Sequence, residues 1–335
     1  RTLPPMAEEG RASILMYIIP AILFLIPTSL VSAEFATTYK GGIYVWIREA
    51  FGNRMGFVAI WLQWIQNVVW YPVQLAFVAA ALAFTINRGD LSNSGLFTAV
   101  VIIVVYWLST FLAFKGGNLF AKVSSIGGMI GVLVPGAILI VLGVLWMAQG
   151  QPISESYLQS SYIPKITGIS SLVLIVSNVL SYAGMEMNAV HAGQMENPKK
   201  DFTKAIALAF ILILCVFIFP TLAIAIAIPA DKLGMANGIM VAFQEFFEKL
   251  NISWMSNVIS GAMFFGAISS VVTWVAGPSK GLLDAGKTGL LPPILQKVNK
   301  NNVQVNILIF QGIIVTILAM IYVLFPDVSD VFIAL

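Results

Sequence analysis

Residues 205–228 read AIALAFILILCVFIFPTLAIAIAI, a run of 24 residues without a charged side chain. A transmembrane helix needs roughly 20 apolar residues, so this run is long enough to cross a bilayer. It is apolar on every side, whereas a barrel strand would alternate apolar and polar residues over about 10 positions. Because helices and closed barrels are the structures that satisfy backbone hydrogen bonds in lipid, the run predicts a membrane-spanning α-helix.

The rest of the chain repeats this pattern. The eight predicted spans are residues 14–35, 57–86, 96–114, 123–148, 166–190, 205–228, 258–283 and 303–325. Charged residues make up 10% of the chain and hydrophobic residues 59%, whereas a soluble domain carries about 25% charged residues. The sequence therefore predicts an all-α polytopic membrane protein.

Lysines and arginines are divided unequally between the loops on the two sides. The loops on the side that joins the first and second spans contain 12 of the 18 Lys and Arg, and the opposite side contains 6. Cytoplasmic loops are enriched in these residues, so the first side is predicted to be cytoplasmic. The net charge of +3 is spread over several loops, which argues against a nucleic-acid partner.

No motif of an enzyme or a resident cofactor is present. The sequence has no Walker loop, no HExxH and no cysteine cluster, and its one cysteine, Cys215, lies inside the sixth span. A lone apolar-embedded cysteine excludes an internal disulfide and every multi-cysteine metal site. We therefore expect no catalytic residues, no metal and no cofactor.

The fifth span carries the main candidate for chemistry. Its apolar run gives way to Ser181, Tyr182, Ala183, Gly184, Met185 and Glu186. A carboxylate at that depth costs about 2.5 to 3.5 kcal/mol on insertion scales, so Glu186 is expected to face a cavity or a partner. Gly184 weakens the helix beside a serine that can bond freed backbone groups. The pattern indicates a discontinuous helix of the kind transporters use near the membrane midplane, or else a glycine packing contact with Glu186 paired to a neighbouring helix.

Other polar positions within the spans allow two interpretations each. The second span contains Gln63, Gln66, Asn67 and Gln74, and the seventh contains Ser269, Ser270, Thr273 and Trp274. Near-helical spacing would place such groups along a water-lined cavity, but interhelical hydrogen bonds would use them equally well. His191, the only histidine, is interpreted as a structural hydrogen-bonding residue, with pH sensing as the alternative. Residues 231–250 predict a short amphipathic helix lying on the outer surface.

Several motifs resemble one known superfamily in the order in which they occur. They are AEFAT at 33–37, GGIYVW at 41–46, SYAGME at 181–186, MENPK at 195–199, GPSKG at 277–281, GLLPP at 289–293 and KVNK at 297–300. Together they cover nearly the whole chain and are similar to the loops and helix ends of amino acid/polyamine/organocation permeases.

This resemblance implies a fold of two inverted five-helix repeats with a broken sixth helix. The eight spans would be helices two to nine of one transmembrane domain, with residues 12–150 from the first repeat and 166–335 from the second. The chain lacks an initiator Met and stops within an apolar stretch, so we expect an internal piece of a longer protein. In the family, the first helix supplies the other half of the substrate site, so the piece is not expected to transport alone.

Within the superfamily, the wording at 181–186 and 274–280 is most similar to the glutamate/GABA antiporters. The implied function is secondary transport by alternating access in the cell membrane, with an amino acid or its decarboxylated amine as substrate. The implied substrate-binding residues are Ser181, Tyr182, Ala183, Gly184, Met185, Glu186, Ser270 and Thr273.

Two departures from the family pattern bear on the substrate. Those glutamate/GABA antiporters carry a Glu where this chain has Ser270, and arginine/agmatine exchangers carry a stacking Trp where it has Leu180. A general amino-acid uptake permease, a nutrient sensor and an ion channel on the same scaffold are the alternatives. A channel would show a polar or charged ring through several spans, whereas the intramembrane charge here is essentially Glu186.

Overall fold

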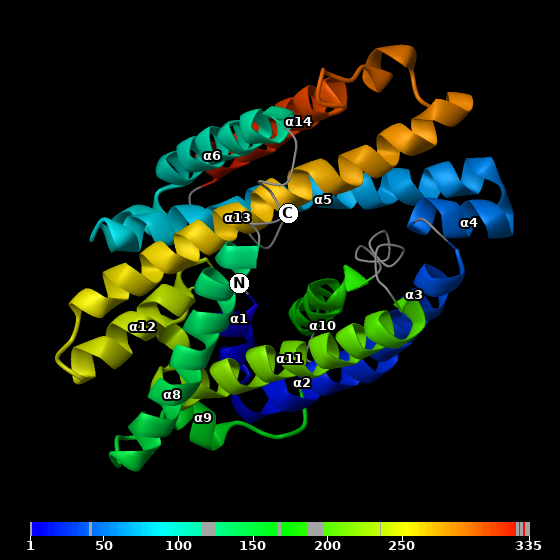
Figure 1. The fold of residues 1–335 in the computed structure, drawn as a ribbon. Helices are drawn as coiled ribbons and strands as arrows, with labels where there is room; N and C mark the ends of the chain where they lie inside the picture. Colours follow the sequence, from blue (N-terminus) through cyan, green and yellow to red (C-terminus); the bar gives the residue numbers. More distant parts are fainter. Residues whose placement is uncertain are drawn as a thin grey trace. The chain divides into compact units, whose positions relative to one another are not determined.

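The structure is a computed structural model, and it describes residues 2–39, 42–115, 125–165, 169–185, 197–234, 236–325, 328 and 331. Every regular element in these ranges is a helix (Figure 1). The α-helices are α1 (Leu3–Glu8), α2 (Ser13–Pro20), α3 (Ile26–Thr38), α4 (Ile43–Phe51), α5 (Asn53–Thr85), α6 (Gly95–Lys115), α8 (Val134–Ala148), α9 (Glu155–Gln159), α10 (Ile169–Tyr182), α11 (Pro198–Ala227), α12 (Gly238–Lys249), α13 (Trp254–Ala285) and α14 (Val305–Leu324).

Shorter helical turns connect or interrupt these helices. The 3₁₀ turns are η1 (Gly10–Ala12), η3 (Gly89–Asn93), η6 (Ala230–Lys232) and η8 (Pro293–Gln296). The π-helical turns are η2 (Ala21–Leu25), η4 (Met129–Leu133) and η7 (Gly286–Leu290). Such π turns insert an extra residue into a helix and locally change its hydrogen bonding.

Seven helical stretches in the described residues are long and apolar enough to cross a membrane. They are Gly10–Thr38, Asn53–Thr85, Gly95–Lys115, Ser125–Ala148, Thr203–Ala227, Trp254–Ala285 and Val305–Leu324. Each coincides with one predicted span and extends it by a few residues or ends within a few residues of it. The remaining predicted span, 166–190, is described only over 169–185, where it contains α10.

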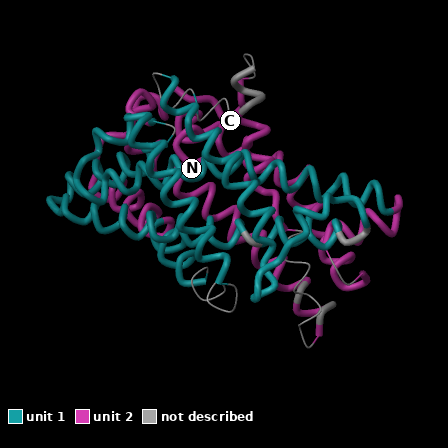
Figure 2. The backbone as a smooth tube through the Cα atoms, turned by 90° about the horizontal axis from the view of Figure 1, so that it is seen from above, with its two compact units in different colours: residues 1, 53–135, 234–335 teal, residues 2–52, 136–233 magenta. Residues whose placement is uncertain are grey.

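The chain forms two compact units, which Figure 2 shows in two colours. Unit 1 contains residues 53–135 and 234–335, and unit 2 contains residues 2–52 and 136–233. Each unit therefore combines helices from the first and the second half of the sequence. The two are described separately below.

In unit 1, α5 packs along α13 and α6 packs along α14 (Figure 1). One close approach of backbones joins the segment around η4 to α13. A Cβ added to Gly131 would lie 2.3 Å from the Cα of Gly266, and one added to Gly266 would lie 2.4 Å from the Cα of Gly131. Small residues at such crossings let membrane helices approach closely, so both positions require glycine.

A buried polar chain connects three helices of unit 1. The indole N–H of Trp64 donates to Oε1 of Gln311 at 2.7 Å, and Nε2 of Gln311 donates to the hydroxyl of Tyr106 at 2.6 Å. Trp64, Gln311 and Tyr106 come from α5, α14 and α6. Polar side chains of these helices therefore bond across helix boundaries, whereas Nδ2 of Asn67, one of the predicted polar positions of this span, donates to the carbonyl of Gln63 within α5 at 2.8 Å.

In unit 2, Tyr17 of α2 is the centre of a contact with α11. Its ring stacks on Phe217 with centroids 5.6 Å apart, and its hydroxyl shares a 3.1 Å hydrogen bond with Oγ1 of Thr221. All of this lies in a fully buried part of the unit, where Tyr17 and Thr221 are 0% exposed.

The residues before the first predicted span also form helical structure and pack against the protein. Residues Leu3–Ala7 of α1 are buried, and α1 packs against α11. The guanidinium of Arg11 lies over the rings of Tyr157 and Tyr162, 5.1 and 5.4 Å from their centroids. Cation–π contacts of this kind hold the loop after α8 against the start of the first span.

The predicted surface helix exists as α12, but its apolar face is covered by protein. Met240 and Phe243 are 0% exposed, and Phe246 and Phe247 are nearly as buried. The helix packs against α13 and α5. The amphipathic pattern predicted the helix correctly, whereas its placement as a surface-lying membrane helix is corrected, since a protein core and a lipid surface select the same apolar stripe.

Candidate functional site

Helix α10 ends at Tyr182, inside the apolar run predicted to span 166–190. Ala183 donates its N–H to the carbonyl of Leu180 at 3.2 Å, a tightened final turn. Gly184 follows with a φ of 114°, in a region that residues with a Cβ avoid. The chain therefore leaves the helical path at the position where the sequence predicted a break.

The first two residues of the predicted break still belong to the helix. Ser181 and Tyr182 are the last residues of α10, and Oγ of Ser181 donates to the carbonyl of Ser177 at 2.8 Å. A serine that bonds the carbonyl four residues earlier is compatible with a continuing helix. The departure from the helix thus begins at Ala183, two residues later than predicted.

Two side chains of α10 bind to the backbone of α2. Nδ2 of Asn178 donates to the carbonyl of Met16 at 3.0 Å, and the hydroxyl of Tyr182 donates to the carbonyl of Tyr17 at 3.0 Å. Asn178 and Tyr182 are four residues apart, so they lie on one face of the helix. Both are 1% exposed, and they fix the end of α10 to α2.

Pro20 leaves the carbonyl of Met16 in α2 without its helical hydrogen-bond donor. In a helix the carbonyl of Met16 would accept from the N–H of residue 20, but proline has none. The amide of Asn178 supplies the missing donor. Nδ2 also approaches Sδ of Met6 at 3.1 Å, which brings α1 into the same contact.

The other predicted residues of unit 2 differ in exposure. Ala183 is exposed and Gly184 is half-buried. Met185 is buried, within a cluster that also contains Leu25 and Trp46. Glu186 and His191 lie outside the described residues. Among the described residues of the predicted site in this unit, Ala183 is therefore the exposed one, and Ser181 is half-buried like Gly184.

Ser270 and Thr273, the two predicted site residues on α13, belong to unit 1. Thr273 is exposed and its hydroxyl donates to the carbonyl of Ser269 at 2.9 Å, while Ser270 is half-buried. The next residue, Trp274, lies against Trp70 of α5 with ring centroids 6.0 Å apart. Ser270, four residues before Trp274, therefore shares a face of α13 with this aromatic pair.

Polar side chains continue from this aromatic pair along α5. Gln66, Trp70 and Gln74 share one face of the helix because they are four residues apart. Gln66 is exposed and Gln74 is half-buried. Within the described ranges, neither amide has a hydrogen-bond partner, so this face has unused donors and acceptors.

Asn178, Tyr17 and Pro20 were not singled out from the sequence. Asn178 is the one amide in the run 172–180, and its spacing of four from Tyr182 was an available signal. The carbonyls of Met16 and Tyr17 could not be predicted as the partners of Asn178 and Tyr182. Every proline inside a helix leaves a carbonyl without its N–H donor, and the sequence does not show which side chain replaces that donor.

The pattern of the amino acid permease family matches residues 3–335. This chain belongs to the amino acid permease family. An uncharacterized transporter of Legionella pneumophila is 41% identical over 98% of this chain and 71% of its own length. A glutamate/gamma-aminobutyrate antiporter of Lactococcus lactis is 31% identical over 94% of this chain and 63% of its own length.

A third relative has an amine in its name. A probable agmatine/putrescine antiporter of Lactococcus lactis is 27% identical over 98% of this chain and 69% of its own length. The chain spans about two thirds of the length of these three relatives. It is accordingly part of a multi-pass membrane transporter of the amino acid/polyamine/organocation superfamily, not an enzyme.

Proposed function

We propose that the protein exchanges an amino acid for its decarboxylated amine across a bacterial inner membrane, as a glutamate/GABA-type antiporter does. The end of α10 at Tyr182, within an apolar run long enough to span, is the observation that carries this proposal. A helix interrupted in the membrane offers backbone groups to substrate charges. The 31% identity to glutamate/gamma-aminobutyrate antiporters supports the same substrate class.

We propose substrate contacts from two sets of residues, one on α10 and its exit and one on α13. In unit 2 the contacts would come from Ser181, Tyr182, Ala183, Gly184, Met185 and Glu186, and in unit 1 from Ser270 and Thr273. The hydroxyl of Tyr182 donates to the carbonyl of Tyr17 and the residue is 1% exposed, so a substrate contact by its side chain would require this packing to open. Glu186 would face the central cavity, since an intramembrane carboxylate requires water or a cation.

The proposed architecture is one transmembrane domain with two inverted repeats, of which residues 12–150 and 166–335 are parts. The eight spans would be helices two to nine. Transport would then follow alternating access around the interrupted helix. Ser270, where glutamate/GABA antiporters carry a Glu, would make this site less acidic and shift its preference among amino acids and amines.

Counterflow in proteoliposomes tests the proposal. Vesicles are made with the full-length protein and loaded with unlabelled glutamate, GABA or putrescine, and entry of labelled substrate is followed. We expect labelled substrate to enter only when an exchangeable partner is inside. Entry into empty vesicles at the same rate would indicate a uniport or uptake permease, and no flux of any amino acid or amine would contradict transport.

The Glu186→Gln variant tests the site assignment in the same assay. It should lower exchange or shift its pH profile while the protein remains folded, because the variant removes the proposed intramembrane charge. Glu155→Gln, which changes an exposed carboxylate of α9, is the matched control. Equal exchange by both variants would remove Glu186 from the site.

A further inference from the structure

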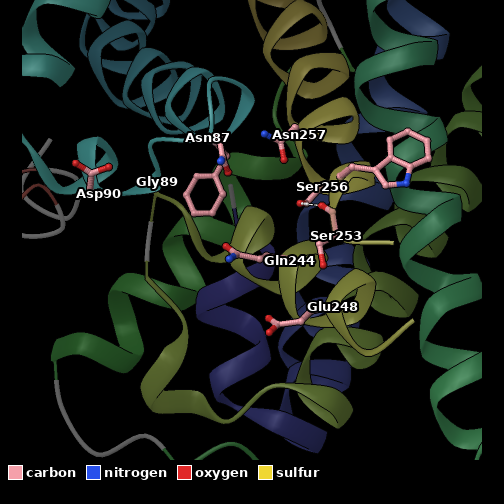
Figure 3. A pocket seen from close by; sticks show the side chains of 10 residues that line it. Asn87, Gly89, Asp90, Gln244, Glu248, Ser253, Ser256 and Asn257 are labelled. Atoms are coloured by element: carbon pink, nitrogen blue, oxygen red, sulfur yellow. Dashed lines mark hydrogen bonds between the residues drawn. The ribbon is translucent and has the colours of Figure 1, made fainter. Parts of the chain in front are cut away.

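Unit 1 has a pocket of about 950 Å³ where the end of α5 and η3 meet α12 and the start of α13. It is lined by Phe84, Asn87, Gly89, Asp90, Gln244, Glu248, Ser253, Trp254, Ser256 and Asn257 (Figure 3). Its volume is in the range of small-molecule sites. The distribution of Lys and Arg places it on the outer side of the membrane, and none of the predicted transport residues lines it.

The charge of the lining is negative. Two of its residues are acidic and none is Lys or Arg. Arg88, just outside the lining, donates to both carboxylate oxygens of Asp90 at 2.9 and 2.8 Å, and these hydrogen bonds lower the pKa of Asp90. The charge of Asp90 is therefore compensated.

Glu248 differs from Asp90 in this respect. In the described part of the chain its carboxylate has neither an ion pair nor a hydrogen bond, and the side chain is exposed at the pocket. One turn earlier on α12, Gln244 extends from the same helix (Figure 3). The pocket consequently contains one uncompensated negative charge beside an amide.

The remaining lining supplies acceptors and aromatic surface. The side-chain amides of Gln244 and Asn257 have no partner among the residues that the structure describes. Trp254 is 64% exposed and Phe84 packs its ring on Gly89. A primary ammonium has three donors to satisfy and is attracted to aromatic faces, so it fits carboxylate and amide oxygens beside these rings.

We propose that this pocket binds a protonated primary amine, with its ammonium group against Glu248 and the amide oxygen of Gln244, which lie one turn apart on α12. The site is separate from the proposed transport site and does not depend on it. A free aliphatic diamine and the headgroup of phosphatidylethanolamine share this chemistry.

Titration with putrescine tests the proposal, with the intrinsic fluorescence of the full-length protein in detergent as the readout. Trp254 lies in the pocket, so we expect a saturable fluorescence change that is lost in Trp254→Phe. Neutral 1-butanol should produce no change, because it lacks the ammonium group. No change with putrescine, or a change that persists in Trp254→Phe, would overturn the proposal.

Charge variants test the role of Glu248. Glu248→Gln should raise the putrescine midpoint about tenfold, as expected for the loss of a charge-assisted hydrogen bond, and Glu248→Asp should retain most of the affinity. Glu155→Gln should leave the midpoint unchanged. Equal midpoints for wild type and Glu248→Gln would overturn the assignment.

Nanodiscs distinguish the two sources of the ammonium group. If the lipid headgroup occupies the pocket, phosphatidylethanolamine nanodiscs should raise the putrescine midpoint above that in phosphatidylcholine nanodiscs, whose quaternary headgroup has no N–H donor. If the natural ligand is a free amine, the midpoints should agree. In either case Glu248→Gln must raise the putrescine midpoint, since both sources place an ammonium group against Glu248.

Discussion

The hydroxyl of Tyr71 on α5 donates a 2.8 Å hydrogen bond to the backbone carbonyl of Trp274 on α13. That carbonyl would normally accept from the N–H of residue 278, but Pro278 lies inside the helix and has no N–H. Tyr71 is 0% exposed, so its hydroxyl supplies the missing donor from inside the protein. The side chain of one helix thus completes the backbone hydrogen bonding of another.

Tyr71→Phe should destabilise the protein by about 1 kcal/mol, because the half-buried carbonyl of Trp274 would lose its donor. Thermal unfolding in detergent, followed by scanning fluorimetry, measures the effect. Tyr39→Phe is the control, since Tyr39 is 44% exposed. Similar unfolding temperatures for both variants would show that the Tyr71 hydroxyl contributes little.

Asn178→Leu should destabilise the protein by about 1 kcal/mol, the scale of interhelical hydrogen bonds in membranes. The substitution keeps the number and branching of the side-chain heavy atoms but leaves the carbonyl of Met16 without its donor beside Pro20. Tyr182→Phe should have a similar effect through Tyr17, and the double variant measures their coupling. Ser177→Ala, one residue before Asn178, should have a smaller effect; an equal effect would contradict the prediction.

Gly131→Ala should destabilise the protein by about 1–3 kcal/mol, as overpacking of a close helix contact does. The new Cβ would meet the backbone of Gly266 at 2.3 Å, where no flexible side chain can move away. Gly128→Ala is a matched control in the same helical stretch, since a Cβ there meets nothing within 4 Å. Comparable yields and unfolding temperatures for the two variants would argue against the close approach.

Glu8, at the end of α1 and outside the spans, should make stability depend on pH. Desolvation by the surrounding protein, with a further contribution from the Glu9 carboxylate, raises the pKa of Glu8 to about 7 from an ordinary value of 4.5, although part of its side chain is exposed. A raised pKa means that the folded state holds the proton more tightly. Its stabilising effect is complete below pH 4.5 and is lost as pH rises to about 7.

Glu8→Gln should therefore unfold like wild type near pH 4.5 and at a higher temperature than wild type at pH 8. The difference in unfolding free energy at pH 8 should be on the order of 1 kcal/mol, because solvent around the exposed part of the Glu8 side chain screens its charge. Unfolding temperatures across this pH range measure it. Parallel curves for the two proteins would contradict the shift.

The membrane spans could be predicted from the sequence because length and hydropathy alone decide them. The run 57–86, for example, became helix Asn53–Thr85, and 303–325 became Val305–Leu324. The burial of Leu3–Ala7 could not be predicted, because it depends on the contact of α1 with α11. Local polarity contains no information on that contact.

The candidate site shows the same division. A break near Gly184 could be predicted, since glycine in an apolar helix beside a serine is a local signal. The orientation of the Tyr182 side chain could not be predicted, because its hydroxyl donates to the carbonyl of Tyr17 in α2, 165 positions away in the sequence. Residue type thus predicted where the helix ends, and tertiary packing decided which groups remain available there.

The pairing of Tyr71 with the carbonyl freed by Pro278 has a consequence for how the family can evolve. A homologue that replaces the proline regains a backbone donor, and the selective pressure to keep a hydroxyl at position 71 is then relaxed. Loss of the hydroxyl before loss of the proline is disfavoured, because the carbonyl of Trp274 would then have no donor and the protein would be destabilised. The two columns of a family alignment should therefore vary together, with phenylalanine at position 71 accompanying a non-proline residue at 278.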